Sequence, residues 1–276
     1  MIEACCKKFL AEGNTTCLSD YPSVRFGLET ALRSLQAHDG LTFNNTPFTK
    51  GEAGIPINGL VWMGDKETMR RRMQSKLEAG FDCVKLKIGA LQIEEELELL
   101  RELRHIASEN DLQIRVDANG AFDKSNVQKV LHELAKLDIH SIEQPIRQGN
   151  WEAMSDLCKS SPLPIALDEE LIGINDEKRK MDLLREISPS YIVLKPTLHG
   201  GLEGTKAWIQ KAKELNIGYW ITSALESNIG LNAIAQFTSE LNTGDFAQGL
   251  GTGQLFVENI PHTGLKIEGN KLFRRI

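Results

Sequence analysis

The sequence predicts an α/β fold built as a parallel (β/α) barrel. From about residue 56 onward, short apolar segments typical of strands alternate with amphipathic segments typical of helices. One strand recurs roughly every 25 to 30 residues, which is the spacing of a barrel unit. A doubly wound open sheet would also alternate, but the glycine-rich nucleotide loop that usually follows its first strand is missing. We therefore expect the sheet to close on itself.

The predicted strands are rich in Val, Ile and Leu and are bounded by Gly, Pro or Asn. In chain order they are Ile57–Trp62, Cys83–Ile88, Gln113–Asp117, Ile139–Glu143, Ile165–Asp168, Tyr191–Lys195, Gly218–Thr222 and Asp245–Leu250. The clearest predicted helix runs from Ile93 to Glu109, where apolar residues recur at helical spacing. Residues 126–137 and 206–215 follow the same pattern.

The two ends of the chain lie outside this repeat. Ile2–Leu10 and Ser23–Leu35 are predicted to be helices, separated by a polar turn. The tail beyond Gly253 has no helix that matches the repeat, and it carries the hairpin-like sequence Gly264-Leu-Lys-Ile-Glu-Gly269. We expect the two ends to pack together as a small second domain.

Composition and charge narrow the class of protein. The chain has 276 residues, 41% of them hydrophobic and 25% charged, which is enough material for a large core. No apolar run is long enough to span a membrane, and the N-terminus lacks the layout of a signal peptide. A net charge of −6 disfavours a nucleic-acid surface and leaves a small molecule as the expected partner. Five cysteines without a CxxC pair indicate reduced thiols, so we expect a cytoplasmic protein.

Ionisable side chains end five consecutive predicted strands. They are Lys85 with Lys87, Asp117, Glu143, Asp168 and Lys195. In a parallel barrel these strand ends meet at one rim, which is where active sites lie. The period of two places both lysines of the second strand on the same face. Three carboxylates from adjacent strands are suited to a hard divalent cation, whereas no pair of histidines has metal-ligand spacing.

Such a rim is suited to removing a proton next to a carboxylate group. A divalent cation at the carboxylate oxygens stabilises the negative charge that develops in an enediolate. The base must be neutral, and a second lysine two residues away, together with the cation and partial burial, is expected to lower the pKa of Lys87. The four tryptophans, Trp62 among them, are expected to pack in the core or between helices and barrel.

These motifs resemble the enolase superfamily, specifically its muconate-lactonising subgroup. The matching motifs, spread from about Pro22 to the end of the chain, are Lys85-Leu-Lys87, the set Asp117, Glu143 and Asp168, and Lys195-Pro followed by Gly200-Gly201. The resemblance implies a (β/α)7β modified TIM barrel with a partial α+β capping domain. It also implies that the three acidic residues bind Mg²⁺, with Mn²⁺ able to substitute, and that Lys87 and Lys195 lie on opposite faces of a carboxylate substrate.

Within the subgroup, the ends of the last two strands resemble the o-succinylbenzoate synthase family. The matching segments are Thr222-Ser-Ala-Leu-Glu226-Ser and Gly249-Leu-Gly-Thr252. Dipeptide epimerases usually carry Asp-x-Asp on the eighth strand, where this chain has Gly249-Leu-Gly251. The resemblance implies the syn-dehydration of 2-succinyl-6-hydroxy-2,4-cyclohexadiene-1-carboxylate to o-succinylbenzoate, a step of menaquinone biosynthesis.

The same resemblance implies a role for each side chain. Lys87 removes the α proton and then protonates the departing hydroxide, while Lys195 stabilises the enediolate from the other face. Lys85 tunes Lys87 and contacts the carboxylate. The candidate substrate-binding residues are Asn119, Ser223, Gly249 and Gly251. Glu169 and Glu226 are expected to orient the groups that contact substrate.

Two other functions remain open at this point. One is racemisation or epimerisation of an N-acylamino acid on the same lysine pair, which needs both lysines as bases. The other is a non-catalytic ligand-binding barrel, or an inactive truncated chain, that retains the site by descent.

The resemblance also divides the chain into three parts. Residues 1–54 correspond to a remnant of an N-terminal capping domain, 55–252 to the catalytic barrel, and 253–276 to a C-terminal segment that packs with the capping domain. Full-length members open with an antiparallel sheet whose loops close over the barrel mouth, and this chain is expected to lack that sheet. The apolar surface left uncovered would favour a homo-oligomer.

Overall fold

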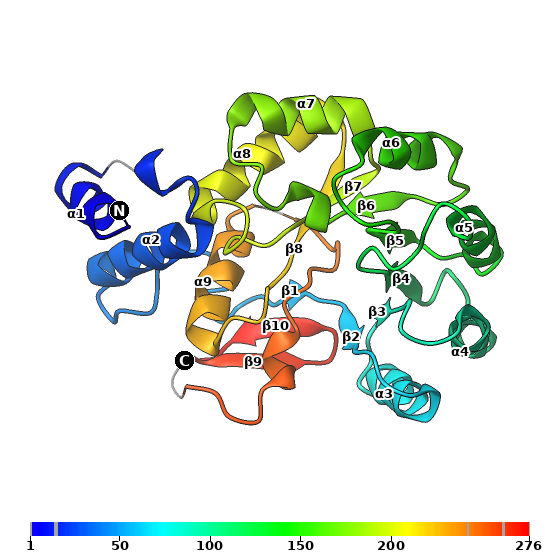
Figure 1. Cartoon of the computed structure of the whole chain (residues 1–276). Coiled ribbons are helices and arrows are strands. Elements are labelled where there is room, and N and C mark those ends of the chain that lie inside the picture. The colour runs from blue at the N-terminus through cyan, green and yellow to red at the C-terminus, as the bar shows by residue number, and fades with distance from the viewer. Residues whose placement is uncertain (1, 14–15, 242, 261–262, 276) are drawn as a thin grey trace.

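The computed structural model describes residues 2–13, 16–241, 243–260 and 263–275, and a parallel sheet lies at its centre (Figure 1). Its strands pair in chain order from β2 to β8, each parallel to the next. They are β2 (Gly59–Val61), β3 (Cys83–Lys87), β4 (Gln113–Asp117), β5 (Ser141–Glu143), β6 (Ile165–Leu167), β7 (Tyr191–Leu194) and β8 (Gly218–Ile221). The first seven predicted strands therefore form, and each begins and ends within two residues of its predicted bounds.

The sheet closes into a barrel through two residues rather than through an eighth strand. Gln248 pairs with Ile57 and Gly249 pairs with Thr222, both as isolated parallel bridges. The prediction of a strand over Asp245–Leu250 is therefore wrong in extent. A Cβ on Gly249 would lie 2.2 Å from the Thr222 hydroxyl oxygen, so the backbones approach more closely there than a side chain allows. Glycine permits this contact but weakens a regular strand.

Helices α3 to α9 each follow a strand and cover the outside of the sheet (Figure 1). They are α3 (Lys66–Glu78), α4 (Ile93–Ile106), α5 (Val127–Ala135), α6 (Trp151–Ser160), α7 (Glu177–Ile187), α8 (Gly201–Glu214) and α9 (Asn228–Ser239). Asp65, Asn150 and Asp176 begin α3, α6 and α7 by accepting a hydrogen bond from a first-turn backbone N–H. Within the described ranges, no helix is long and apolar enough to cross a bilayer.

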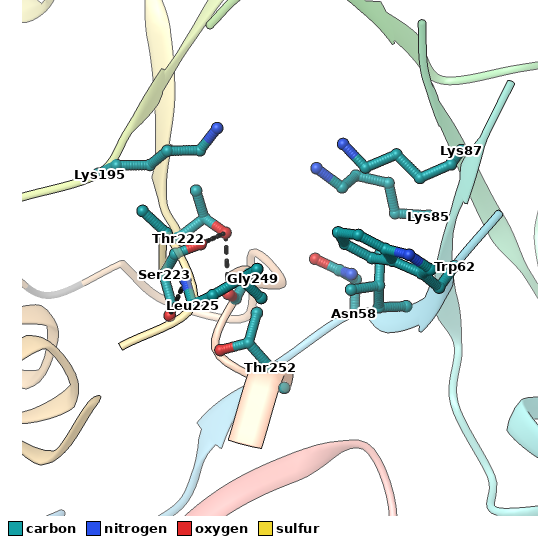
Figure 2. A pocket seen from close by; sticks show the side chains of 13 residues that line it. Asn58, Trp62, Lys85, Lys87, Lys195, Thr222, Ser223, Leu225, Gly249 and Thr252 are labelled. Atoms are coloured by element: carbon teal, nitrogen blue, oxygen red, sulfur yellow. Dashed lines mark hydrogen bonds between the residues drawn. The ribbon is translucent and has the colours of Figure 1, made fainter. Parts of the chain in front are cut away.

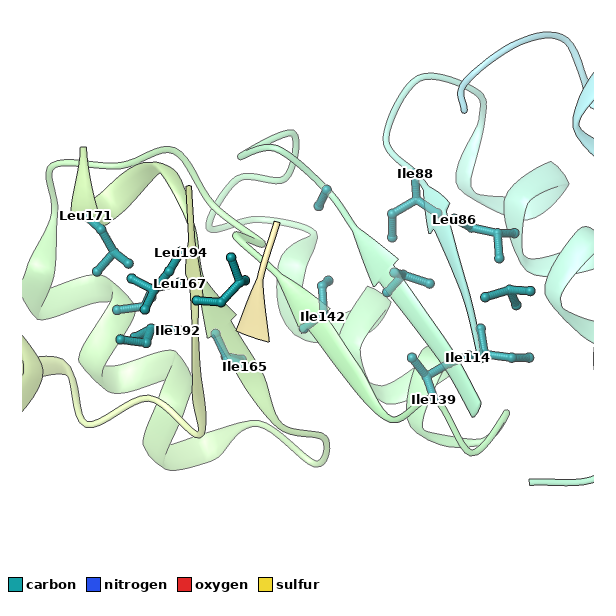
Figure 3. Close-up of a cluster of buried hydrophobic side chains, with 14 of the residues drawn as sticks. Leu86, Ile88, Ile114, Ile139, Ile142, Ile165, Leu167, Leu171, Ile192 and Leu194 are labelled. Atoms are coloured by element: carbon teal, nitrogen blue, oxygen red, sulfur yellow. The ribbon is translucent and has the colours of Figure 1, made fainter. Parts of the chain in front are cut away.

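The two faces of each strand meet different environments. Side chains that point outward from the barrel, such as Leu86, Ile114, Ile142 and Ile192, are at most 1% exposed. They belong to one continuous apolar cluster with the inner faces of the helices, and Figure 3 shows part of it. The alternate side chains point into the barrel, where many of them are polar. The apolar layer thus holds the strands in place and leaves the barrel interior free for chemistry.

Arg115 closes the amino-terminal end of the barrel interior. It is 1% exposed, and its guanidinium lies 4.7 Å from the centre of the Trp220 ring and 4.3 Å from that of Phe246. It also donates a hydrogen bond to the Ala247 carbonyl at 2.8 Å. This packed layer blocks the lower end of the barrel, so a ligand reaches the interior from the carboxyl ends of the strands.

A second, antiparallel sheet forms from segments far apart in the sequence. Its order is β1 (Ile55–Pro56), β10 (Lys271–Arg274) and β9 (Leu265–Glu268). The predicted hairpin-like tail is therefore confirmed as the β9–β10 pair. Because β1 leads directly into the barrel, this sheet ties the C-terminal segment to the base of β2.

The N-terminal helices are α1 (Ile2–Glu12) and α2 (Pro22–Gln36), as predicted to within two residues. Helix α2 packs on α8, where the Glu29 carboxylate accepts the Leu202 backbone N–H at 2.6 Å. Arg274 donates to the Thr49 carbonyl at 3.1 Å, so the C-terminal sheet also contacts the segment after α2. The three-part division of the chain stays a prediction. All five cysteines are free, in keeping with the expected reduced thiols.

Candidate active site

The predicted rim residues do meet at the carboxyl end of the barrel. Lys85 and Lys87 alternate with the outward-facing Leu86 along β3, so both point into the barrel. Lys195 follows the last residue of β7 on the other side. Figure 2 shows Lys195 across the cavity from Lys85 and Lys87, with the three Nζ atoms directed toward one another. Two lysine groups therefore face each other across one space.

Three buried carboxylates lie beside these lysines. Asp117 ends β4, Glu143 ends β5 and Asp168 follows β6, and each is at most 1% exposed. One oxygen from each lies within 4.8 Å of the other two. One oxygen of Glu143 and one of Asp168 are buried without a hydrogen-bond partner among the described residues. An all-oxygen set with unpaired, buried acceptors fits a hard divalent cation such as Mg²⁺.

The lysine ammonium groups are held by the same carboxylates. Lys85 donates to Asp117 and to Glu143, each at 2.9 Å. Lys87 donates to the same Asp117 oxygen at 2.5 Å, and Lys195 donates to Asp168. Each of these three lysines is thus fixed by an acidic residue at the end of a neighbouring strand.

In this cluster, burial and the charges of neighbouring lysines and carboxylates together set the pKa of each group. Burial by itself lowers the pKa of Lys85, but the negative charges of Asp117 and Glu143 outweigh it and raise that pKa. Burial alone would raise the pKa of Asp117, but the positive charges of Lys85 and Lys87 hold the pKa of that carboxyl below its usual range. Burial, followed by the charge of Asp117, raises the pKa of Glu143. A further positive charge nearby would therefore favour the ionised form of Glu143.

Asn119 extends the cluster along the rim. Its Oδ1 accepts a hydrogen bond from Lys87 at 2.7 Å, and its Nδ2 donates to Glu169 at 2.8 Å. The other Glu169 oxygen is buried without a partner among the described residues. Burial, followed by the charge of Asp168, raises the pKa of Glu169. The predicted site residue Asn119 thus lies next to Lys87 and is linked through it to Asp117.

The remaining predicted residues, Ser223, Gly249 and Gly251, line the opposite wall of the same cavity. The cavity has a volume of about 200 Å³. Ser223 donates its hydroxyl proton to Glu226 and accepts from the backbone N–H groups of Leu225 at 3.1 Å and Glu226 at 3.3 Å. Its hydroxyl therefore forms hydrogen bonds within its own turn.

Sequence reasoning missed several residues of this cavity. Trp62 was expected to be a packing residue, but it lines the cavity, with its ring centre 5.7 Å from the Lys87 Nζ atom. Trp62 ends the first predicted strand, so the strand-end rule that found the lysines also points to it. Asn58, Leu225 and Thr252 line the cavity too. Leu225 adopts a φ of 74°, which no feature of the sequence indicates.

Comparison with known proteins gives one family and several relatives. The family described as "Enolase C-terminal domain-like" matches residues 68–270. The o-succinylbenzoate synthase of Desulfotalea psychrophila is 49% identical over 252 residues, covering 91% of this chain and 68% of that protein. The N-succinyl-L-Arg/Lys racemase of Bacillus cereus is 25% identical, covering 65% of this chain and 47% of that protein.

The solved structures include a relative with the same fold along almost the whole chain. The crystal structure of MenC from Desulfotalea psychrophila LSv54 superposes with a TM-score of 0.87 at 44% sequence identity. The superposition covers 99% of this chain and 74% of that one. The relatives thus extend beyond the part that this chain matches.

Proposed function

This chain belongs to the enolase superfamily, and from that premise we propose that it is a carbon–oxygen lyase, an o-succinylbenzoate synthase. The proposed reaction is the syn-dehydration of 2-succinyl-6-hydroxy-2,4-cyclohexadiene-1-carboxylate to o-succinylbenzoate. The observation that carries the proposal is the pair Lys87 and Lys195 facing each other beside three buried carboxylates. The 49% identity with a synthase supports the choice among superfamily reactions. We place this reaction in menaquinone biosynthesis, in the cytoplasm.

The metal ion of this proposal is Mg²⁺ or Mn²⁺, with Asp117, Glu143 and Asp168 as its ligands. When bound, the ion supplies positive charge to the substrate carboxylate and stabilises the enediolate. The structural support is the pair of buried oxygens of Glu143 and Asp168 that the described residues leave without partners.

In the proposed reaction, Lys87 carries the proton that leaves the substrate carbon. In its neutral form, Lys87 takes the proton from the carbon next to the carboxylate, and the electrons of that C–H bond enter the enediolate. The C–O bond to the hydroxyl group breaks next, and the Lys87 ammonium gives its proton to the departing hydroxide, which leaves as water. The ring becomes aromatic. Lys195 remains an ammonium and stabilises the enediolate from the opposite face.

Neighbouring groups position the substrate and Lys87. Lys85 binds two of the three carboxylates and so fixes the charge around Lys87. Asn119 holds Lys87 through its amide oxygen. We assign Ser223, Gly249 and Gly251 to substrate binding through the wall that they form opposite Lys87.

A second candidate function is racemisation of an N-acylamino acid. The observation that favours it is the same facing lysine pair, together with the similarity to an N-succinylamino acid racemase. Racemisation needs a base on each face, whereas dehydration needs one base and one cation. Lys195→Arg preserves a cation but not a base, so it abolishes racemisation and leaves part of the dehydration.

The testing experiment follows the absorbance change of Mg²⁺-dependent dehydration in the unmutated chain, Lys87→Ala and Lys195→Arg. We expect turnover in the unmutated chain, its loss in Lys87→Ala and partial turnover in Lys195→Arg. An unmutated chain that racemises N-succinylamino acids but does not dehydrate would replace the synthase by the racemase. A folded chain that binds the substrate and does neither would be the non-catalytic barrel.

A further inference from the structure

A second cavity adjoins the reaction cavity described above. It has a volume of about 740 Å³ and lies between α3 and the short helix η3 (Thr252–Leu255). The residues that line both cavities are Leu60, Trp62, Leu225 and Gly251. The two cavities therefore share one wall, and a ligand held at the lysines can extend past Trp62 and Leu225 into the second one. We call this second cavity the α3 groove.

The α3 groove is basic. Its lining includes Arg71, Arg72 and Lys76, and it contains no Asp or Glu. Arg72 donates to the backbone carbonyls of Trp62 and Met63, each at 2.8 Å, so its guanidinium is fixed beside the shared wall. Within the described residues, Arg71 is exposed and forms neither a hydrogen bond nor an ion pair. Lys76 donates to the Gln254 amide oxygen at 2.7 Å. Among the described residues, Arg71 is thus the cation of this groove whose side chain has no hydrogen-bond or ion-pair partner.

The reaction cavity offers no comparable cation for a second anionic group. Lys85, Lys87 and Lys195, its three cationic lining residues, are each bound to a carboxylate of the rim. Its volume of about 200 Å³ also falls below the roughly 300 Å³ at which pockets for drug-sized ligands begin. A substrate with a carboxylate at the reacting carbon and another at the end of an arm needs more room and another cation.

We propose that the α3 groove is the subsite for the distal carboxylate of such a substrate, and that Arg71 binds it. This inference rests on the proposed function insofar as the substrate carries a succinyl arm. The synthase substrate carries a succinyl arm, and so does an N-succinylamino acid, so the subsite selects the arm and not the reaction. Arg72 is a positioning residue in this subsite, because it holds the Trp62 backbone at the entrance to the groove.

The strained turn at Leu225 supports this assignment. Leu225 has a φ of 74°, a region that a bulky residue occupies only when its surroundings enforce it. The Ser223 hydroxyl accepts the Leu225 backbone N–H at 3.1 Å and is itself held by Glu226. The fold thus stabilises a costly conformation that places Leu225 at the boundary between the two cavities.

The test compares binding of two ligands by titration calorimetry of the full chain in Mg²⁺ buffer. The ligands are o-succinylbenzoate and its derivative with a primary amide in place of the succinyl carboxylate. We expect Arg71→Gln to raise the Kd of o-succinylbenzoate about tenfold and to leave the Kd of the amide unchanged. In turnover, the same variant raises KM with little change in kcat. Arg101→Gln, on the exposed face of α4, is the matched control and changes neither Kd.

Each other outcome has a defined meaning. If Arg71→Gln binds o-succinylbenzoate as tightly as the unmutated chain, or weakens both ligands equally, the α3 groove is not the carboxylate subsite. Turnover by the unmutated chain in that case leaves the synthase assignment intact. If the unmutated chain dehydrates nothing but still prefers the carboxylate through Arg71, the subsite stands and the synthase assignment fails. If it binds neither ligand, both proposals fail.

Discussion

Asn119 joins two charged groups at the barrel mouth, although its own side chain carries no charge. Its amide bridges the Lys87 ammonium and the Glu169 carboxylate. Its φ is 44°, in the left-handed region that asparagine tolerates better than most residues. The backbone turn after β4 therefore aims the amide, and the amide in turn fixes where Lys87 sits above Asp117.

Two substitutions of Asn119 distinguish the role of its amide group from the role of its backbone conformation. We expect both Asn119→Gly and Asn119→Ala to lower kcat by about tenfold or more, because Lys87 loses its neutral acceptor. Asn119→Ala should also reduce the free energy of unfolding by about 1 kcal/mol, since alanine resists a positive φ. Steady-state kinetics and urea denaturation measure the two effects. Unchanged kcat in the glycine variant would remove Asn119 from the positioning of Lys87.

For individual residues of the site, the sequence predicts the charged ones better than the neutral ones. The strand-end rule identified Lys85, Lys87 and the three carboxylates because charge at the end of an apolar strand is conspicuous. Leu225 gave no signal, since an exposed leucine in a loop is ordinary and its φ is set by the Ser223–Glu226 turn. That turn also occupies the Ser223 hydroxyl, which sequence alone cannot show.

Among the elements, α2 contacts the barrel at several points, and one of them is the buried carboxylate of Glu29. Glu29 accepts the Leu202 N–H at the start of α8 and an Arg25 hydrogen bond at 2.8 Å. Gly201 leaves the space for it, because a Cβ there would lie 2.4 Å from a Glu29 oxygen. An acidic side chain at a helix N-terminus satisfies unpaired N–H groups and complements the helix dipole.

Removing this contact should loosen α2 from α8. We expect Glu29→Ala to lower the free energy of unfolding by about 1–2 kcal/mol, because Leu202 N–H and Arg25 both lose a buried partner. Glu12→Ala, on the exposed end of α1, serves as the control and should change it by less than about 0.5 kcal/mol. Urea denaturation of the two variants makes the comparison, and equal midpoints would contradict this role of Glu29.

The bounds of helices and strands were predictable where the local sequence determines them. Strand β4 begins and ends as predicted, because its alternation of apolar Ile114 and Val116 with polar residues is followed by the Ala-Asn-Gly turn. The extent of the last barrel segment, Asp245–Leu250, was not predictable. Its pairing depends on how closely Gly249 approaches Thr222, which is distant in the sequence. Likewise, the pairing of β1 with β10 joins residues more than 200 positions apart, and no local pattern encodes that partnership.

For the molecule as a whole, we expect the carboxylate cluster to couple binding of a divalent cation to folding. Asp117, Glu143 and Asp168 come from the ends of three neighbouring strands, so a cation bound to all three would hold these strands together. We expect saturating Mg²⁺ to raise the melting temperature by about 5 °C. Differential scanning calorimetry should show this rise for the unmutated chain and for the exposed control Asp156→Asn, but not for Asp168→Asn. A rise of the same size in Asp168→Asn would place the ion elsewhere.

A buried histidine, His199, and a half-buried one, His140, make the stability of the whole fold depend on pH. Burial lowers the pKa of His199 to about 3, and burial with the charge of Arg115 lowers that of His140 to about 4. In the unfolded chain both histidines titrate at about pH 6.5, so below that pH the unfolded state takes up protons that the folded state does not. Stability should therefore fall as the pH drops from about 6.5 toward 4.

The contribution of His140 can be measured separately. We expect His140→Gln to make the decline in the free energy of unfolding between pH 6.5 and 4.5 shallower. Chemical denaturation at several pH values gives the slope. His105→Gln, on the exposed surface of α4, should keep the slope of the unmutated chain. A slope for His140→Gln identical to that control would assign the pH dependence to other groups.

The two-residue closure of the barrel makes one part of the ring easier to open than the rest. Gln248 and Gly249 hold β8 and the β2 segment together, whereas β3 and β4 pair along five residues each. Amide hydrogen exchange should therefore be faster at Gly249 than in β4, because a local opening there breaks fewer hydrogen bonds. Since Gly249 also lines the reaction cavity, these openings would widen the cavity transiently. The barrel thus has a seam, and the seam runs through its binding site.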